Sequence, residues 1–167
     1  MKNTSLSSYA IEILEEGLKA DKIGASLGDA IEAYRMREIH KGAGSVIIPR
    51  GSLLQIIISL GEEHKQDLEK LWAEAGGWYG KYLAGKLRQD EVLPFLRQDL
   101  LTSWNLDEVE ISEGEEVILR FTGFSMSDEF TGLLLKYIGG IMDSLGLREV
   151  ERDSLRGMAT IKYLNLK

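Results

Sequence analysis

A change in hydrophobic spacing near Asp107 constrains the fold of this chain more than any other feature. Up to Trp104, apolar residues recur at intervals of three and four, as they do on amphipathic helices. Over residues 107–112 they alternate with acidic residues, and after the acidic turn at 113–116 the alternation resumes over 117–122. These patterns predict a β-hairpin that follows a helical N-terminal half.

The rest of the chain completes a mixed pattern. Helical spacing returns over residues 128–145, and two short alternating segments follow at 147–152 and 158–166, around a turn at 153–157. The C-terminal half therefore has the order strand, strand, helix, strand, strand. We predict an α+β fold in which the helical N-terminal half packs on a small antiparallel sheet.

The first residues form a separate helical segment. Apolar positions in residues 5–18 follow helical spacing, and a second helix over 30–41 stops at a glycine-rich stretch, residues 42–44. We expect an N-terminal helical extension over residues 1–44 and a main domain over 45–167. The apolar face of the first helix needs burial, which favours a homodimer with these helices in its interface. That face consists of Leu6, Tyr9, Ile13, Leu14 and Leu18.

Composition and charge exclude several classes of function. The chain has no cysteine, so it has no disulfide framework, zinc-thiolate site, iron–sulfur cluster or cysteine nucleophile. The formal net charge is −7, and it falls entirely on residues 51–167, so there is no basic face for nucleic acid. No apolar run is long enough for stable membrane insertion and the first residues are polar, so we expect a cytoplasmic protein.

A helix around GGWYGKYLAGKL has one face with almost no side chains. Glycine costs about 1 kcal/mol relative to alanine inside a helix, so the small residues have a purpose. One interpretation is close packing against another helix, and the other is room for a ligand beside Trp78 and Tyr82. The small face consists of Ala73, Gly77, Gly80 and Ala84.

A family resemblance covers residues 45–167. The order VIIPRGSLLQII, GWYGKYLAG, a helix that ends in a tryptophan before an acidic hairpin, KYIGGIM and EVERDSLRGMATIKY resembles the 4-vinyl reductase domain family. Its superfamily also includes the TRAPP vesicle-tethering core subunits and the haem nitric-oxide-binding domains. The resemblance implies an α+β ligand-binding domain, usually dimeric, with an apolar cavity between helices and sheet.

The sequence departs from the family in its closing hairpin. Glu151 and Gly157 match, but Asp153 or Ser154 stands near the first cysteine position of the family and Ile161 at the second. The metal or redox role of those cysteines therefore does not transfer. The axial histidine and Tyr-Ser-Arg signature of the haem relatives are also missing, so we expect no haem, no other cofactor and no metal.

The remaining chemical motifs are weak. His64 lies beside Glu63 and Asp67, but a metal shell needs three or four converging ligands, and a charged helix surface explains this run. No phosphate-binding glycine loop and no Gly-x-Ser-x-Gly turn occurs. We single out no catalytic residue and expect a binding protein rather than an enzyme.

The resulting hypothesis is a non-enzymatic protein that encloses an apolar ligand, a hydrocarbon or fatty-acyl chain, between its helices and its sheet. The alternative is an assembly subunit resembling the TRAPP core subunits, and a role accessory to tetrapyrrole vinyl reduction follows only from the family name. Each predicted lining residue has ordinary core packing as its alternative. The predicted lining residues are Gly77, Trp78, Gly80, Tyr82, Leu83, Phe95, Trp104, Phe121, Tyr137 and Ile141.

Overall fold

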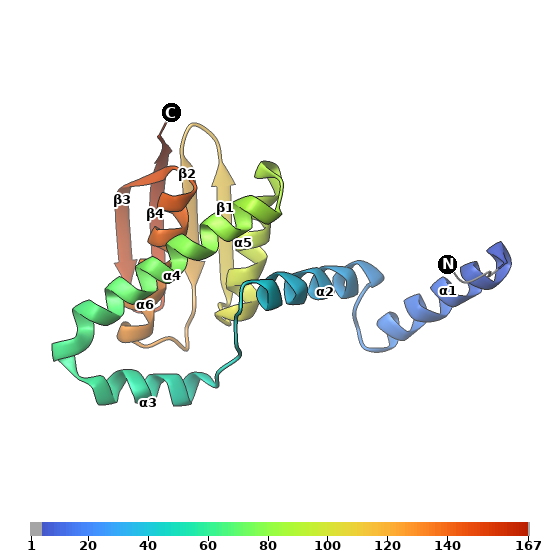
Figure 1. Cartoon of the computed structure of the whole chain (residues 1–167), viewed down its shortest axis with the longest axis horizontal. Helices are drawn as coiled ribbons and strands as arrows, with labels where there is room; N and C mark the ends of the chain where they lie inside the picture. The colour runs from blue at the N-terminus through green and yellow to red at the C-terminus, as the bar shows by residue number, and fades with distance from the viewer. Residues whose placement is uncertain (1–4, 167) are drawn as a thin grey trace. The chain divides into compact units, whose positions relative to one another are not determined.

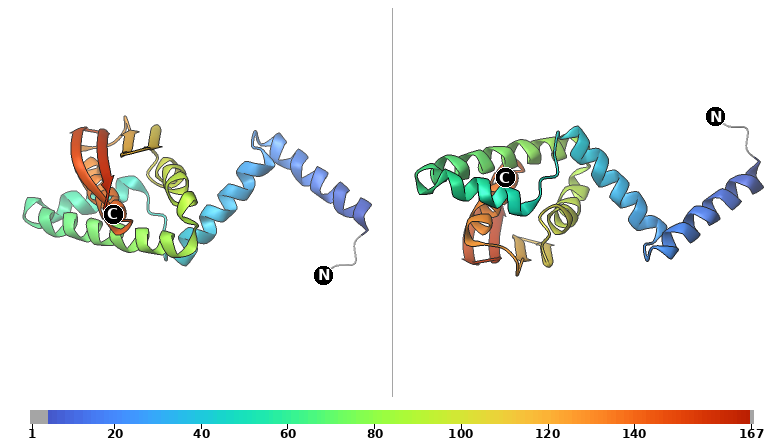
Figure 2. Two further views of the ribbon diagram at one scale, coloured as in Figure 1. Left: turned by 90° about the horizontal axis from the view of Figure 1, so that it is seen from above. Right: turned by 90° about the horizontal axis from the view of Figure 1, so that it is seen from below.

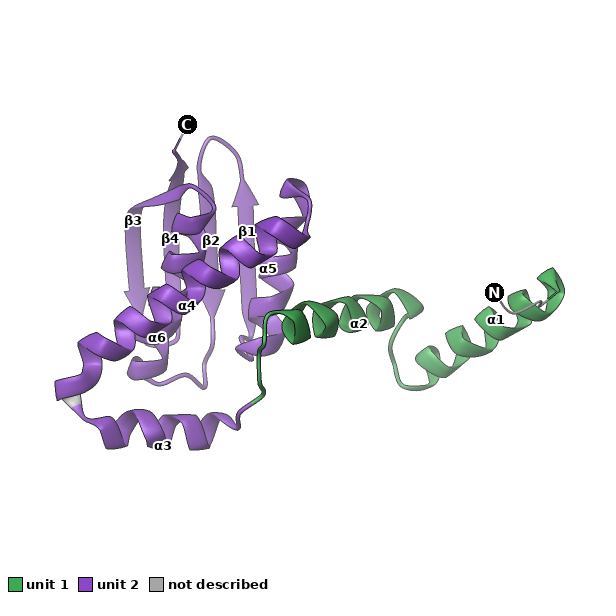
Figure 3. Ribbon diagram, viewed as in Figure 1, with its two compact units in different colours: residues 1–47 green, residues 48–167 purple. Residues whose placement is uncertain are grey.

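The chain divides into two compact units in a computed structural model that describes residues 5–166. Unit 1 is Met1–Ile47 and unit 2 is Ile48–Lys167, as Figure 3 shows in two colours. The boundary lies a few residues beyond the glycines at which the sequence pattern placed it.

Unit 1 consists of two helices, α1 (Leu6–Lys22) and α2 (Leu27–Gly42). The hydroxyl of Ser5 caps α1 by accepting the Ser8 N–H at 3.2 Å. At the start of α2, the Asp29 N–H donates to the Ser26 hydroxyl and the Ser26 N–H donates to the Asp29 carboxylate, at 3.0 and 2.7 Å. This reciprocal pair is a capping box, which fixes where α2 begins.

Unit 2 begins with helices. Pro49 keeps Ile48 out of helical geometry, and α3 starts directly after it. Gly61, whose φ of 71° lies in the left-handed region, ends α3 and lets the chain turn. The helices of unit 2 are α3 (Arg50–Leu60), the short η1 (Glu62–His64), α4 (Lys65–Lys86), α5 (Gln89–Ser103) and α6 (Asp128–Ser144).

Four antiparallel strands form one sheet in the order β1-β2-β4-β3. Helices cover one face of this sheet (Figures 1 and 2), where Leu119 and Ile161 are fully buried. The predicted α+β fold and its strand, strand, helix, strand, strand order are confirmed. The strands are β1 (Glu108–Glu113), β2 (Val117–Thr122), β3 (Leu147–Leu155) and β4 (Met158–Asn165).

Glycines bring α4 and α6 into backbone contact. A Cβ on Gly76 would lie 2.0 Å from the Tyr137 carbonyl oxygen, and a Cβ on Gly140 would lie 2.0 Å from the Ala73 carbonyl oxygen. A Cβ on Gly80 would lie 2.8 Å from the backbone oxygen of Ile141. The small-residue face of α4 is therefore filled by α6, in agreement with the close-packing interpretation.

Candidate functional site

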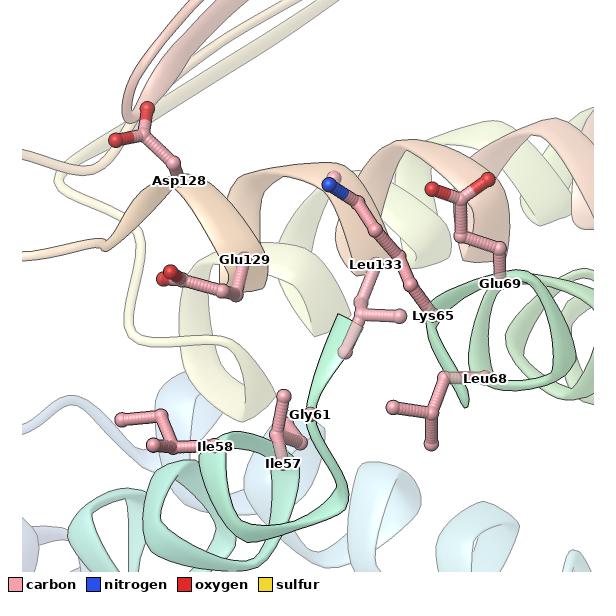
Figure 4. Close-up of a pocket in the computed structure, with 10 residues that line it drawn as sticks. Ile57, Ile58, Gly61, Lys65, Leu68, Glu69, Asp128, Glu129 and Leu133 are labelled. Atoms are coloured by element: carbon pink, nitrogen blue, oxygen red, sulfur yellow. The ribbon is translucent and has the colours of Figure 1, made fainter. Parts of the chain in front are cut away.

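A groove of about 300 Å³ lies between α3 and the first turns of α4 and α6, entirely within unit 2 (Figure 4). We call it the α3–α4–α6 groove. Segments about 70 residues apart in sequence meet here, because α6 returns past the junction of α3 and α4. Its lining residues are Ile57, Ile58, Gly61, Lys65, Leu68, Glu69, Asp128, Glu129, Gly132 and Leu133.

The inner surface of the groove is apolar. Ile57 and Leu133 are buried and Leu68 is half-buried, and one comes from each of the three helices. Ile58 adds an exposed side chain at the edge. A Cβ on Gly132 would meet no other described part of the chain within 4 Å, so this glycine leaves space that a side chain would fill.

Charged groups surround this apolar surface. Glu69 accepts from Lys136 across α4 and α6, with 3.0 Å between Oε2 and Nζ. The hydroxyl of Ser127, the residue that caps α6, holds the pKa of Glu129 below its usual range, and the positive charge of Lys65 acts in the same direction. Glu129 is therefore ionised at neutral pH. Asp128 completes the rim of the groove.

A second cluster combines aromatic rings with a buried carboxylate. The Tyr79 hydroxyl donates to Asp99 Oδ2 at 2.9 Å, and the Ser103 hydroxyl donates to Oδ1 at 2.6 Å. The ring of Tyr137 lies 6.1 Å from that of Tyr79 and 5.5 Å from that of Trp104. Burial, followed by the charge of Asp99, raises the pKa of both tyrosines far above the ordinary value, so both stay protonated. This cluster joins α4, α5 and α6.

The lining residues predicted from sequence lie outside the groove. The structure brings Trp104 and Tyr137 together in the aromatic cluster and stacks Trp78 on Tyr82 at 5.5 Å. Gly77 and Gly80 face α6. The remaining four are buried side chains: Leu83, Phe95, Phe121 and Ile141. Their role in binding a ligand stays a prediction.

The groove residues were not singled out from sequence. Ile57 and Leu133 look like ordinary core residues, since nothing in local spacing tells which distant helix they meet. The one signal in the sequence is Gly132, one of three glycines inside the amphipathic helix α6.

No metal site is formed by the described part of the chain. Within residues 5–166, no three His, Asp or Glu side chains converge as metal ligands would. The ring nitrogens of His64 lie 3.8 Å from carboxylate oxygens of Glu63 and Asp67, and all three side chains are exposed. No helix over the same residues combines the length and apolar character needed to cross a bilayer.

No family model matches the sequence, and no curated protein matches it. Among solved structures, the chain is similar to a doubly substituted variant of Tt H-NOX, at 15% identity and a TM-score of 0.41, over 75% of this chain and 80% of that one.

Proposed function

We propose that unit 2 is a binding module that takes up an apolar small molecule, a hydrocarbon or an acyl chain, in the α3–α4–α6 groove without converting it chemically. The observation that carries the proposal is the convergence of apolar side chains from three helices on one space. About 300 Å³ is at the lower end of the range for small-molecule sites. The groove suits a ligand with a short hydrocarbon chain rather than a large ring system.

The apolar surface supplies the attraction. Ile57, Leu68 and Leu133 face the same space, and each square ångström of apolar surface that a ligand covers is worth roughly 25 cal/mol. The open position beside Gly132 gives the ligand access to the α6 side of the groove. Van der Waals contact with three helices would hold the hydrocarbon or acyl chain of the ligand in place.

The rim would set the preference for a head group. Lys65 shares the rim with three carboxylates, of which Glu69 is already paired with Lys136. A neutral or cationic head therefore fits this rim better than a carboxylate, because acids remain in excess. Polar groups at the edge of an apolar site commonly fix the orientation of the ligand in this way.

Calorimetric titration of the full chain with 1-octanol tests the proposal. We expect saturable binding by the parent and its loss in Gly132→Leu, whose side chain would occupy the groove. Gly139→Leu is the matched control, because Gly139 lies two turns further along α6, has equally open space and does not line the groove. Equal binding by both variants, or none by the parent, would contradict the proposal.

A second candidate function is that of an assembly subunit, comparable to the TRAPP core subunits in the superfamily of the 4-vinyl reductase domain. The observation that favours it is the number of large apolar side chains that unit 1 leaves exposed. The two functions are compatible, since the groove belongs to unit 2 and these side chains to unit 1.

A further inference from the structure

The first observation is an exposed apolar stripe along α1. Its members recur at helical spacing, and the acidic and basic residues of α1 lie mainly on the opposite side. All of them are exposed, and Leu6, Leu14 and Leu18 are each more than 60% exposed. The α1 stripe is Leu6, Tyr9, Ile13, Leu14 and Leu18.

A second stripe runs along α2. Leu27, Ile31 and Tyr34 fall at intervals of four and three, so they share one side of the helix, and all are exposed. We call them the α2 stripe. Together, the two stripes expose eight large apolar side chains, enough for a contact of the standard size, to which each partner contributes roughly 800 Å².

Charged residues flank the two stripes in matching positions. Glu12 and Glu16 follow Tyr9 by three and seven residues, whereas Arg37 and Lys41 follow Tyr34 by the same intervals. Each pair therefore lies along the same edge of its stripe. When two helices pack face to face in antiparallel orientation, these edges meet, and the acids of α1 would lie beside the bases of α2.

We propose that the partner of unit 1 is unit 1 of a second copy of this chain, with the α1 stripe of each copy packed antiparallel on the α2 stripe of the other. A twofold axis forms this contact twice, so both stripes of both copies are covered. The acidic residues on the polar side of α1 disfavour an anionic lipid surface as the occupant.

Light scattering on the full chain gives the first test. We expect the mass of two 18.7 kDa chains, and at least tenfold weaker association for Leu14→Glu and for Ile31→Glu. Leu71→Glu is the control, because Leu71 is an exposed apolar residue on α4 of unit 2 and should leave the dimer intact. A monomeric parent, or a dimer that neither stripe variant weakens, would overturn the proposal.

Charge exchange distinguishes a second copy from closure of α1 on α2 within one chain. One variant carries Glu12→Lys and Glu16→Lys, and the other carries Arg37→Glu and Lys41→Glu. Each should be mainly monomeric alone, whereas a mixture of the two should form heterodimers, since opposite charges then meet at both contacts. Circular dichroism checks that both variants keep their helices. A mixture that stays monomeric, or a monomer that binds phosphatidylserine vesicles through α1, would overturn the proposal.

Discussion

The Tyr79 hydroxyl donates a 2.9 Å hydrogen bond to the Asp99 carboxylate, and both side chains are buried. Tyr163, on β4, offers a contrast. It is fully buried, and its hydroxyl has no hydrogen-bond partner among the described residues. Two buried tyrosines of one unit thus differ in whether their polar group is satisfied, which gives them opposite expected effects on stability.

Removing the two hydroxyls separately tests this difference. Tyr79→Phe should lower the free energy of unfolding by about 1–2 kcal/mol, because Asp99 loses a buried donor. Tyr163→Phe should leave the free energy of unfolding unchanged or raise it, since it removes a polar atom without a partner. Urea denaturation of both variants measures the effects. Equal losses of the free energy of unfolding in the two variants would contradict a stabilising role for the Tyr79–Asp99 hydrogen bond.

Alkaline pH should destabilise the chain through its buried tyrosines. Burial raises the pKa of Tyr79, Tyr137 and Tyr163 well above the unfolded value of about 10. A raised folded pKa gives stability that is complete below the unfolded pKa and is lost as the pH rises above it, because only the unfolded chain then releases the protons. Stability should therefore fall above about pH 10.

Absorbance at 295 nm follows the same ionisations directly. Of the six tyrosines of the chain, Tyr79, Tyr137 and Tyr163 should ionise only when the protein unfolds, because the pKa of each is raised. Ionisation of Tyr79, Tyr137 and Tyr163 before the protein unfolds would contradict their raised pKa.

The glycines of α4 and α6 divide into two kinds that substitution can separate. Gly76→Ala places a Cβ 2.0 Å from the Tyr137 carbonyl oxygen, so it should destabilise unit 2 by about 1–3 kcal/mol through overpacking. Gly139→Ala meets open space and should stabilise α6 by about 0.5–1 kcal/mol through higher helix propensity. Thermal melts compare the two variants. A higher melting temperature in both variants would mean that α4 and α6 can move apart without loss of stability.

The sequence predicts the helices and strands of this fold better than it predicts which of them pack or pair together. Spacing of three to four and of two residues located the helices and the hairpin, because these periods follow from backbone geometry alone. The sequence pattern predicts that the third strand ends at residue 152. In the structure β3 continues to Leu155, because its pairing with β4 extends beyond the apolar alternation. Such pairing is a property of two strands rather than one.

The candidate site shows the same limit. The small residues on α4 were compatible with both packing and a cavity, and the choice depends on where α6 lies. The groove depends on Ile57 of α3 meeting Leu133 of α6, which no local pattern encodes. A glycine inside a helix marks a place of interest, but its neighbours decide whether the space is filled, as at Gly76, or open, as at Gly132.

The charged rim predicts a head-group preference. Octylammonium and 1-octanol should bind more tightly than octanoate, because carboxylates outnumber Lys65 around the groove. The ratio between octylammonium and octanoate should shrink at high salt, since partly exposed charges are screened. Calorimetry at two salt concentrations measures it. Tighter binding of octanoate than of octylammonium would contradict a head group that lies at the acidic rim of the groove.

Methyl-resolved NMR during titration with 1-octanol tests the central claim most directly, because it locates the ligand. We predict saturable shifts for the methyl groups of Ile57, Leu68 and Leu133, which line the α3–α4–α6 groove, and none for those of Leu83 and Ile141 in the interior. Shifts at Leu83 and Ile141 with none in the groove, or no saturable shift at all, would contradict the account.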